Sequence, residues 1–86
     1  MNTQAPRPVE HVPEKAKQAF YKAMKDREVD LGLYELLFFE DELHYIITTS
    51  YKHKHAGLRG SDPQFPDYEV SISKDDFSVT RVSIAR

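Results

Sequence analysis

Histidine is the first residue type in this chain that could do chemistry, and two of the four histidines lie two positions apart. His53 and His55 would face the same side of an extended chain, where their imidazoles could chelate a metal ion. Lys52 and Lys54 flank them and would repel a cation, and no carboxylate follows before Asp62. We therefore predict no metal site and no cofactor, and we interpret these histidines as surface residues.

Paired acids are the second candidates, because general acid–base catalysis needs convergent carboxylates in a protected pocket. The adjacent acids here are Asp75-Asp76 and the run from Glu40 to Glu42, and both fall in predicted turns. Acids at hairpin turns point into water instead of toward each other. The chain has no Cys, and no Ser lies beside a His in a recognisable nucleophile motif. The sequence therefore predicts a protein with no catalytic residues, which is not an enzyme.

The segment from Lys52 to Asp67 is a long connection between two predicted strands, and its first half is basic. Irregular connections of this length are uncommon in compact domains unless they are functional or disordered. Arginine is also enriched at the hot spots of protein interfaces. We predict that this loop binds a partner protein through Lys52, His53, Lys54, His55 and Arg59.

Charge is unevenly distributed along the chain. The stretch from Glu28 to Ser50 has six acids and no Lys or Arg, whereas the next ten residues have three Lys or Arg, two His and no acid. Two interpretations remain open: the charges belong to solvated strand ends and turns, or they form two patches of opposite sign that orient a partner. The formal net charge of −2 argues against general affinity for nucleic acid, which needs a strongly positive field.

Hydrophobic periodicity predicts one helix followed by four strands. Between Pro13 and Arg27, apolar residues recur at helical spacing, namely Ala16, Ala19, Phe20, Ala23 and Met24. Runs rich in β-branched and aromatic residues predict strands over residues 33–40, 43–51, 68–73 and 77–84. Short turns make neighbouring strands antiparallel, and one helix covers one face of a sheet. We expect an α+β fold in which the N-terminal helix packs on a curved four-stranded antiparallel β-meander, in the order α-β-β-β-β.

The last predicted strand changes phase. Phe77 and Val79 share one parity, whereas Val82 and Ile84 share the other. Either a β-bulge near Thr80-Arg81 or a strand that is buried on opposite faces at its two ends would explain this pattern. Both explanations predict a strongly bent terminal strand.

The predicted sheet carries more apolar surface than one small helix can cover. Leu37, Phe39 and Ile46 fall on the parity opposite to the residues expected to face the helix. A second covering would explain them, such as the N-terminal arm, a twin subunit or a partner protein. Alternatively, they are core residues of a strongly curved sheet. We predict these three residues as possible sheet-face contacts.

The length of 86 residues fits a single domain. We divide the chain into a flexible N-terminal arm over residues 1–12 and an α+β domain over residues 13–86. The arm is rich in proline and lacks the apolar run of a secretory signal, and no segment is long enough to span a bilayer. Because cysteine is also absent, we expect a cytoplasmic protein that does not bind membranes.

The second half of the chain carries a pattern of four short motifs. They are an Arg-Gly-Ser-x-Pro loop, an aromatic-Glu-Val-x-Ile strand, a Lys-Asp turn and a Val-rich terminal strand, here Arg59–Pro63, Tyr68–Ile72, Lys74-Asp75 and Val79–Arg86. In this pattern and in its helix, the chain resembles small bacterial cystatin-like and PepSY-like α+β domains and immunity proteins of the nuclear-transport-factor fold. The resemblance implies a cystatin-like fold and, for many such proteins, neutralisation of a cognate toxin by binding. The chain lacks the additional helices of the nuclear-transport-factor-like members, so the deep conical pocket of those members is not expected here.

Together, the residues predict a non-enzymatic protein-binding module. The resemblance implies that it is an immunity protein or inhibitor, which occludes a bacterial toxin or effector. A second hypothesis is a small ligand-binding or accessory domain with a pocket between helix and sheet, lined by Phe20, Met24, Tyr45 and Tyr68. A homodimer formed through exposed sheet faces also remains open.

Overall fold

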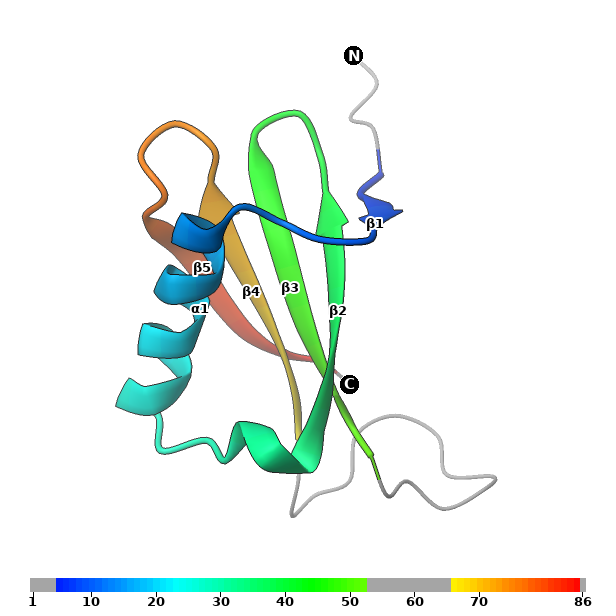
Figure 1. The fold of residues 1–86 in the computed structure, drawn as a ribbon, viewed down its shortest axis with the longest axis vertical. Coiled ribbons are helices and arrows are strands. Elements are labelled where there is room, and N and C mark those ends of the chain that lie inside the picture. Colours follow the sequence, from blue (N-terminus) through cyan, green and yellow to red (C-terminus); the bar gives the residue numbers. More distant parts are fainter. Residues whose placement is uncertain (1–4, 53–65, 86) are drawn as a thin grey trace.

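The computed structural model describes residues 5–52 and 66–85 and shows an α+β domain with one open antiparallel sheet (Figure 1). Its elements are β1 (Arg7–Val9), α1 (Glu14–Asp26), the 3-10 helix η1 (Leu31–Leu33), β2 (Tyr34–Glu40), β3 (His44–Tyr51), β4 (Asp67–Ser73) and β5 (Val79–Ala85). The five strands lie in sequence order, and each pairs antiparallel with the next. The α+β class and the antiparallel sheet are confirmed, whereas the predicted number of four strands is wrong.

The additional strand is β1, which lies in the segment predicted as an N-terminal arm. It pairs with β2, and Pro8 lies opposite Phe39. Farther along the same segment, Val12 is buried in the core. Proline is rare within strands because it cannot donate to the ladder, which explains why the sequence pattern does not predict β1. Residues 7–9 therefore belong to the sheet.

Helix α1 ends in a Schellman motif that uses a residue other than glycine. The N–H of Glu28 donates to the carbonyl of Lys25, and the N–H of Val29 donates to the carbonyl of Met24, both at 3.0 Å. Glu28 has a φ of 59°, in the left-handed region that favours glycine. Val29 then packs against the core, so the motif directs the chain from α1 back toward the sheet.

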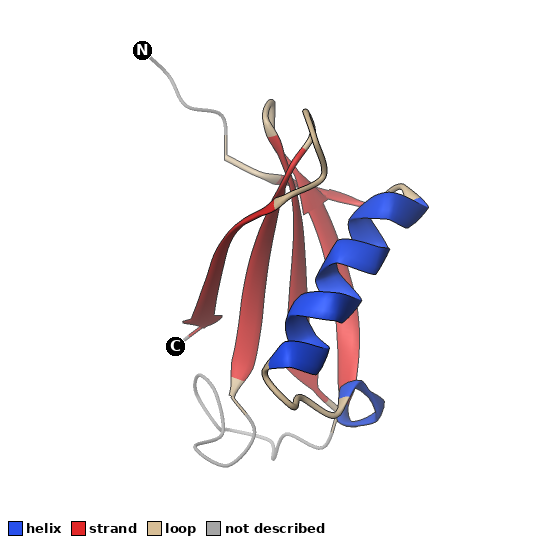
Figure 2. Ribbon diagram, turned by 90° about the vertical axis from the view of Figure 1, so that its left-hand side faces the viewer, coloured by secondary structure: helices blue, strands red, loops and turns tan. Residues whose placement is uncertain are grey.

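The core fills the space between α1 and one face of the sheet, which we call the covered face (Figure 2). Its fully buried members are Ala16, Phe20, Met24, Ile47, Val70 and Ile72. The helical stripe therefore meets alternate residues of the central strands, as the two periodicities predict. In the part of the chain that the structure describes, no helix lies over the other face, which we call the open face.

Strand β5 contains a bulge, which accounts for its change of phase. The register shifts between the pair Ser71–Arg81 and the pair Ile72–Val79, so Thr80 is the extra residue on β5. The bulge puts Val79 on the same face as the later apolar residues of the strand, toward α1. Of the two explanations offered by the sequence, the bulge is the one that the structure shows.

Candidate functional site

The candidate functional site is the apolar part of the open face, formed by Leu37, Phe39 and Ile46. Strand alternation turns these side chains away from α1, because their neighbours in sequence pack on the covered face. Phe39 of β2 lies opposite Ile46 of β3, and Leu37 lies on the same face one pleat farther along β2. The three residues predicted as sheet-face contacts thus form one group, which we call the apolar cluster.

The apolar cluster is unevenly covered. Ile46 is 6% exposed because it lies between Phe39 and Ser71 on the neighbouring strands, whereas Leu37 is 48% exposed. Pro6 joins the three cluster residues along a groove of about 410 Å³. The N-terminal segment therefore covers one border of the cluster, which is one of the coverings considered above, and leaves Leu37 accessible.

Acidic side chains border the apolar cluster on the open face. Glu35 lies opposite Ser50, and Glu69 lies opposite Thr48, which in turn lies opposite Leu37. Both glutamates are exposed, and Glu69 also lines the groove. The open face thus combines an apolar centre with a charged border, which is acidic beside Leu37 and carries Arg81 opposite Ser71 on the β5 side. Protein interfaces have this anatomy, with an apolar centre and a polar rim.

Side chains replace the backbone ladder where β3 and β4 lead into residues 53–65. The N–H of Tyr51 donates to Oδ1 of Asp67 at 3.0 Å, and the N–H of Tyr68 donates to Oγ1 of Thr49 at 2.8 Å. Thr49 and Asp67 are both buried. Burying a polar group is costly unless it is hydrogen-bonded, so these bonds stabilise the positions where the connection leaves and rejoins the sheet.

Most of the predicted binding loop lies outside the described residues. Lys52 is described: its side chain is exposed, and its N–H donates to the carbonyl of Leu33 at 3.0 Å. The remaining predicted contacts, His53, Lys54, His55 and Arg59, fall in the range 53–65, and their role in binding stays a prediction. Strands β3 and β4 meet this connection at the same end of the sheet as Glu35.

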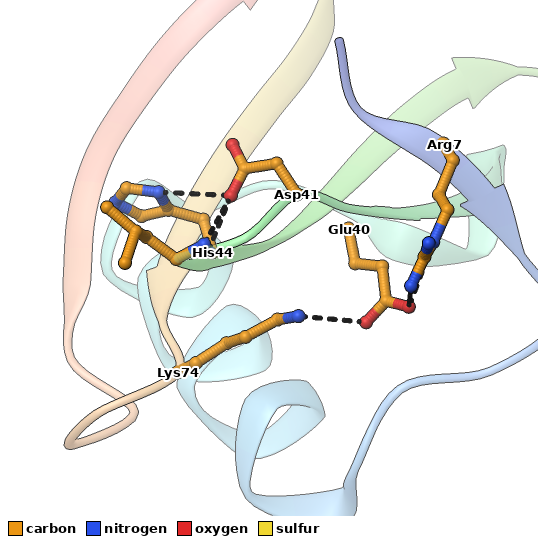
Figure 3. Close-up of polar contacts among 6 residues, drawn as sticks. Arg7, Glu40, Asp41, His44 and Lys74 are labelled. Atoms are coloured by element: carbon orange, nitrogen blue, oxygen red, sulfur yellow. Dashed lines mark hydrogen bonds and ion pairs between the residues drawn. The ribbon is translucent and has the colours of Figure 1, made fainter. Parts of the chain in front are cut away.

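A network of ion pairs lies at the opposite end of the sheet, around the β2–β3 turn (Figure 3). Nη2 of Arg7 and Nζ of Lys74 lie 3.0 and 3.1 Å from the two carboxylate oxygens of Glu40. The hydrogen bond from Arg7, and then that from Lys74, lowers the pKa of Glu40 below its ordinary value of 4.5. Nζ of Lys74 also lies 5.1 Å from the centroid of the Tyr45 ring. The network links β1, β2 and the β4–β5 turn, and it neutralises part of the acidic stretch noted in the sequence.

Asp41 and His44 form a pair beside this network (Figure 3). Oδ1 of Asp41 lies 3.4 Å from Nδ1 of His44, and it accepts the backbone N–H groups of His44 at 2.7 Å and Leu43 at 2.9 Å. Burial acts to raise the pKa of Asp41, but the backbone hydrogen bonds from Leu43 and His44 outweigh it, so the pKa falls below 3.8. This pair was not among the residues predicted from the sequence, although the Asp-x-x-His spacing across a short turn is a signal for it. A carboxylate held in this way stabilises the turn.

The four residues proposed to line a ligand pocket lie in or against the core. Phe20 and Met24 are fully buried, and Tyr45 and Tyr68 pack against the same cluster. The ring of Tyr45 also stacks on that of Phe77, with 6.2 Å between centroids. Because these side chains fill the space between α1 and the covered face, we interpret them as packing residues.

Within residues 5–52 and 66–85, no group of three or more His, Cys, Asp or Glu residues is placed to hold a metal ion. Over the same ranges, no helix has the length and apolar character needed to cross a membrane. No family model, curated protein or solved structure matches this chain, so no family is assigned to it.

Proposed function

We propose that this chain is a non-enzymatic protein-binding module whose open face docks on a partner protein. The observation that carries this proposal is Leu37, a half-exposed residue that extends an apolar cluster on the face opposite α1. Burial of apolar surface is the main driving force of protein association. The partner would place an apolar side chain in the groove beside Leu37, Phe39 and Ile46.

The two acids near Leu37 support a partner that places positive charge at this part of the open face. Glu35 and Glu69 border the apolar cluster and are exposed, so Lys or Arg side chains of a partner could pair with them. Charged pairs at the rim of an interface mainly accelerate association, and salt screens them. The association rate should therefore fall as the salt concentration rises.

A narrower proposal concerns the class of the partner. The resemblance to small immunity proteins supports a bacterial toxin or other effector, which this chain would inhibit by occluding its surface. The predicted contacts of the basic loop belong to the same proposal, because the connection joins the sheet beside the acidic border of the open face. Reversing charge in Lys54→Glu/Arg59→Glu should weaken binding of the partner, and full retention of affinity would exclude the loop from the interface.

A comparison of three immobilised baits tests the proposed function. The baits are the wild type, Leu37→Asp and a matched control, Leu43→Asp, which changes a 69% exposed leucine at the β2–β3 turn. Quantitative mass spectrometry of proteins captured from the cells that produce this chain would identify the partner. We expect a protein that the wild type and the control capture equally, and that Leu37→Asp captures roughly tenfold less. A partner that binds again from purified components, but equally well to all three baits, would contradict docking on the open face.

A further inference from the structure

The two edges of the sheet differ in how well they are protected against pairing with another strand. The edge strand β1 has three residues, and Pro8 occupies its centre. The other edge strand, β5, has seven residues and contains no proline. Short strands and prolines protect sheet edges, because they leave few donors for an incoming strand. The bulge at Thr80 protects the start of β5, so the regular stretch that follows it, from Arg81 to Ala85, is the edge that can accept another strand.

The backbone groups at the centre of β5 point away from the sheet. Across the β4–β5 turn, the N–H of Ser73 donates to Ser78 at 2.8 Å, and the carbonyl of Ser73 accepts from Phe77 at 3.0 Å. Along an antiparallel strand, the backbone N–H and C=O groups of successive residues point alternately toward one neighbouring strand and toward the other. Because those of Ser73 point toward β5, so do those of the residues two and four positions before it on β4. With the observed register, the residues on either side of Val82 bond toward β4. The N–H and C=O of Val82 itself therefore face the open edge.

A projecting side chain and a depression lie at opposite ends of β5. Ile84, near the end of the strand, is 53% exposed and lies on the same side of the sheet as Val82. At the start of the strand, a depression of about 570 Å³ lies between α1 and β5. Its lining combines apolar residues with polar ones: Ala19, Ala23, Phe77 and Val79, and Lys22, Asp26, Arg27 and Ser78. Figure 2 shows β5 as the outer strand of the sheet, at the edge where the chain ends.

We propose that β5 pairs with β5 of a second copy of this chain, antiparallel and about a twofold axis through Val82. In this register Val82 faces its own equivalent and Arg81 faces Ser83 of the second copy, whereas the bulged Thr80 lies at the border of the regular pairing, beside Ile84 of the second copy. The projecting Ile84 of each copy then lies at the end of the strand where the other copy has its depression. A twofold interface requires this reciprocity, because the same surface must supply both partners of every contact. The product is a single sheet that continues through both copies.

The charges on β5 are compatible with this register. Arg81 faces Ser83 of the second copy, so no like charges lie directly opposite each other. Within each copy, Ser83 lies opposite Glu69. Arg81 can therefore extend over the small Ser83 of the second copy toward the Glu69 beyond it. This arrangement favours a second copy over an unrelated strand, because the chain itself supplies the complementary charge.

Disulfide crosslinking tests the proposed register, since the chain has no cysteine of its own. Val82→Cys would place a thiol opposite its equivalent at a Cα separation of about 5.5 Å, which lies within the range of disulfides. We expect mild oxidation to give a covalent dimer of Val82→Cys at least about tenfold faster than of the control Leu43→Cys. Arg81→Cys/Ser83→Cys should also crosslink rapidly, and Arg81→Cys alone should not, because its equivalent lies two positions away along the strand.

Sedimentation equilibrium supplies a second readout that needs no cysteine. We expect the wild type to form a reversible dimer, and Ile84→Glu to remain monomeric with an unchanged circular dichroism spectrum. Equal crosslinking of Val82→Cys and Leu43→Cys, or a wild type that stays monomeric at its highest soluble concentration, would overturn the proposal. Leu37→Asp should leave the dimer intact. The proposed dimer and the proposed docking of a partner can therefore be contradicted independently of each other.

Discussion

The covered and open faces of the sheet are built from alternate residues of the same strands, yet they differ in how fully their apolar side chains are buried. On the covered face, Ile47, Val70 and Ile72 are fully buried against Phe20 and its helical neighbours. On the open face, exposure increases across the apolar cluster from buried Ile46 to half-exposed Leu37, and acids lie at the border of the cluster. The centre of the covered face is buried by α1, whereas the open face is only partly covered by the N-terminal segment.

This difference separates the residues that stabilise the fold from those available for binding. Deleting buried atoms costs transfer free energy and leaves a cavity, so residues of the covered face should dominate stability. Exposed apolar residues contribute little to stability, and a cluster of them with a polar border is a typical interaction site. The predictions below compare matched changes on the two faces.

The largest expected effect comes from truncating the same aromatic residue type on each face. Phe20→Ala removes a fully buried ring and should lower the free energy of unfolding by about 3–5 kcal/mol. Phe39→Ala removes a half-buried ring from the open face and should cost about 1–2 kcal/mol. Urea denaturation monitored by circular dichroism measures both. Equal losses would mean that the open face belongs to the core.

The next effect concerns two adjacent threonines of β3 that face opposite ways. Thr49→Val removes the hydroxyl that accepts the N–H of Tyr68 and should lower the free energy of unfolding by about 1–3 kcal/mol, because that N–H loses its partner. Thr48→Val makes the same change on the open face and should shift stability by no more than about 0.5 kcal/mol. If the two variants unfold at the same urea concentration, the bond from Tyr68 to Thr49 is not what stabilises the junction.

A smaller effect is expected for Leu37, the most accessible residue of the apolar cluster. Leu37→Ser should lower the free energy of unfolding by about 1 kcal/mol, since half of this side chain is already in water. The same variant should bind the partner more weakly than the wild type. Chemical denaturation and binding are measured on one preparation. A loss of stability as large as that of Phe20→Ala would remove the distinction between the faces.

The smallest expected effect is a change in the pH dependence of stability and concerns the ion pairs around Glu40. Because Arg7 and Lys74 lower its pKa in the folded state, Glu40 stabilises the protein above pH 4.5, and this stabilisation is lost as the pH falls through the lowered value. Glu40→Gln should therefore flatten the decline in thermal midpoint between about pH 5 and pH 3. Glu42→Gln, in the same turn, is the matched control. A wild-type and a Glu40→Gln profile that coincide would show that these ion pairs contribute nothing measurable.

Much of the covered face could be predicted from the sequence, because its determinants are local and periodic. The helical stripe around Phe20 and the alternation through Ile47 and Val70 each specify one buried surface. The change of phase between Val79 and Val82 also indicated a bulge, although the register was needed to choose it over the alternative.

Other features depend on contacts between distant segments and have weak local signals. Strand β1 contains Pro8, which opposes strand formation, and it is held by pairing with residues near Phe39. The bond from Tyr68 to Thr49 joins residues far apart in sequence, which no periodicity encodes. The apolar cluster was predictable as a set of residues because of its parity. Its partial covering by Pro6 was not, since that requires the path of the N-terminal segment.

The central claim is that the open face binds a partner protein through Leu37 and its neighbours. Its most direct test is the dissociation constant of the purified partner for the wild type, Leu37→Asp and Leu43→Asp, measured by titration calorimetry. We predict that Leu37→Asp raises the Kd by roughly 30-fold or more, equivalent to about 2 kcal/mol, because a charge enters the apolar contact. Leu43→Asp should leave the Kd within about twofold of the wild type. A Kd for Leu37→Asp that equals the wild-type value would contradict the claim.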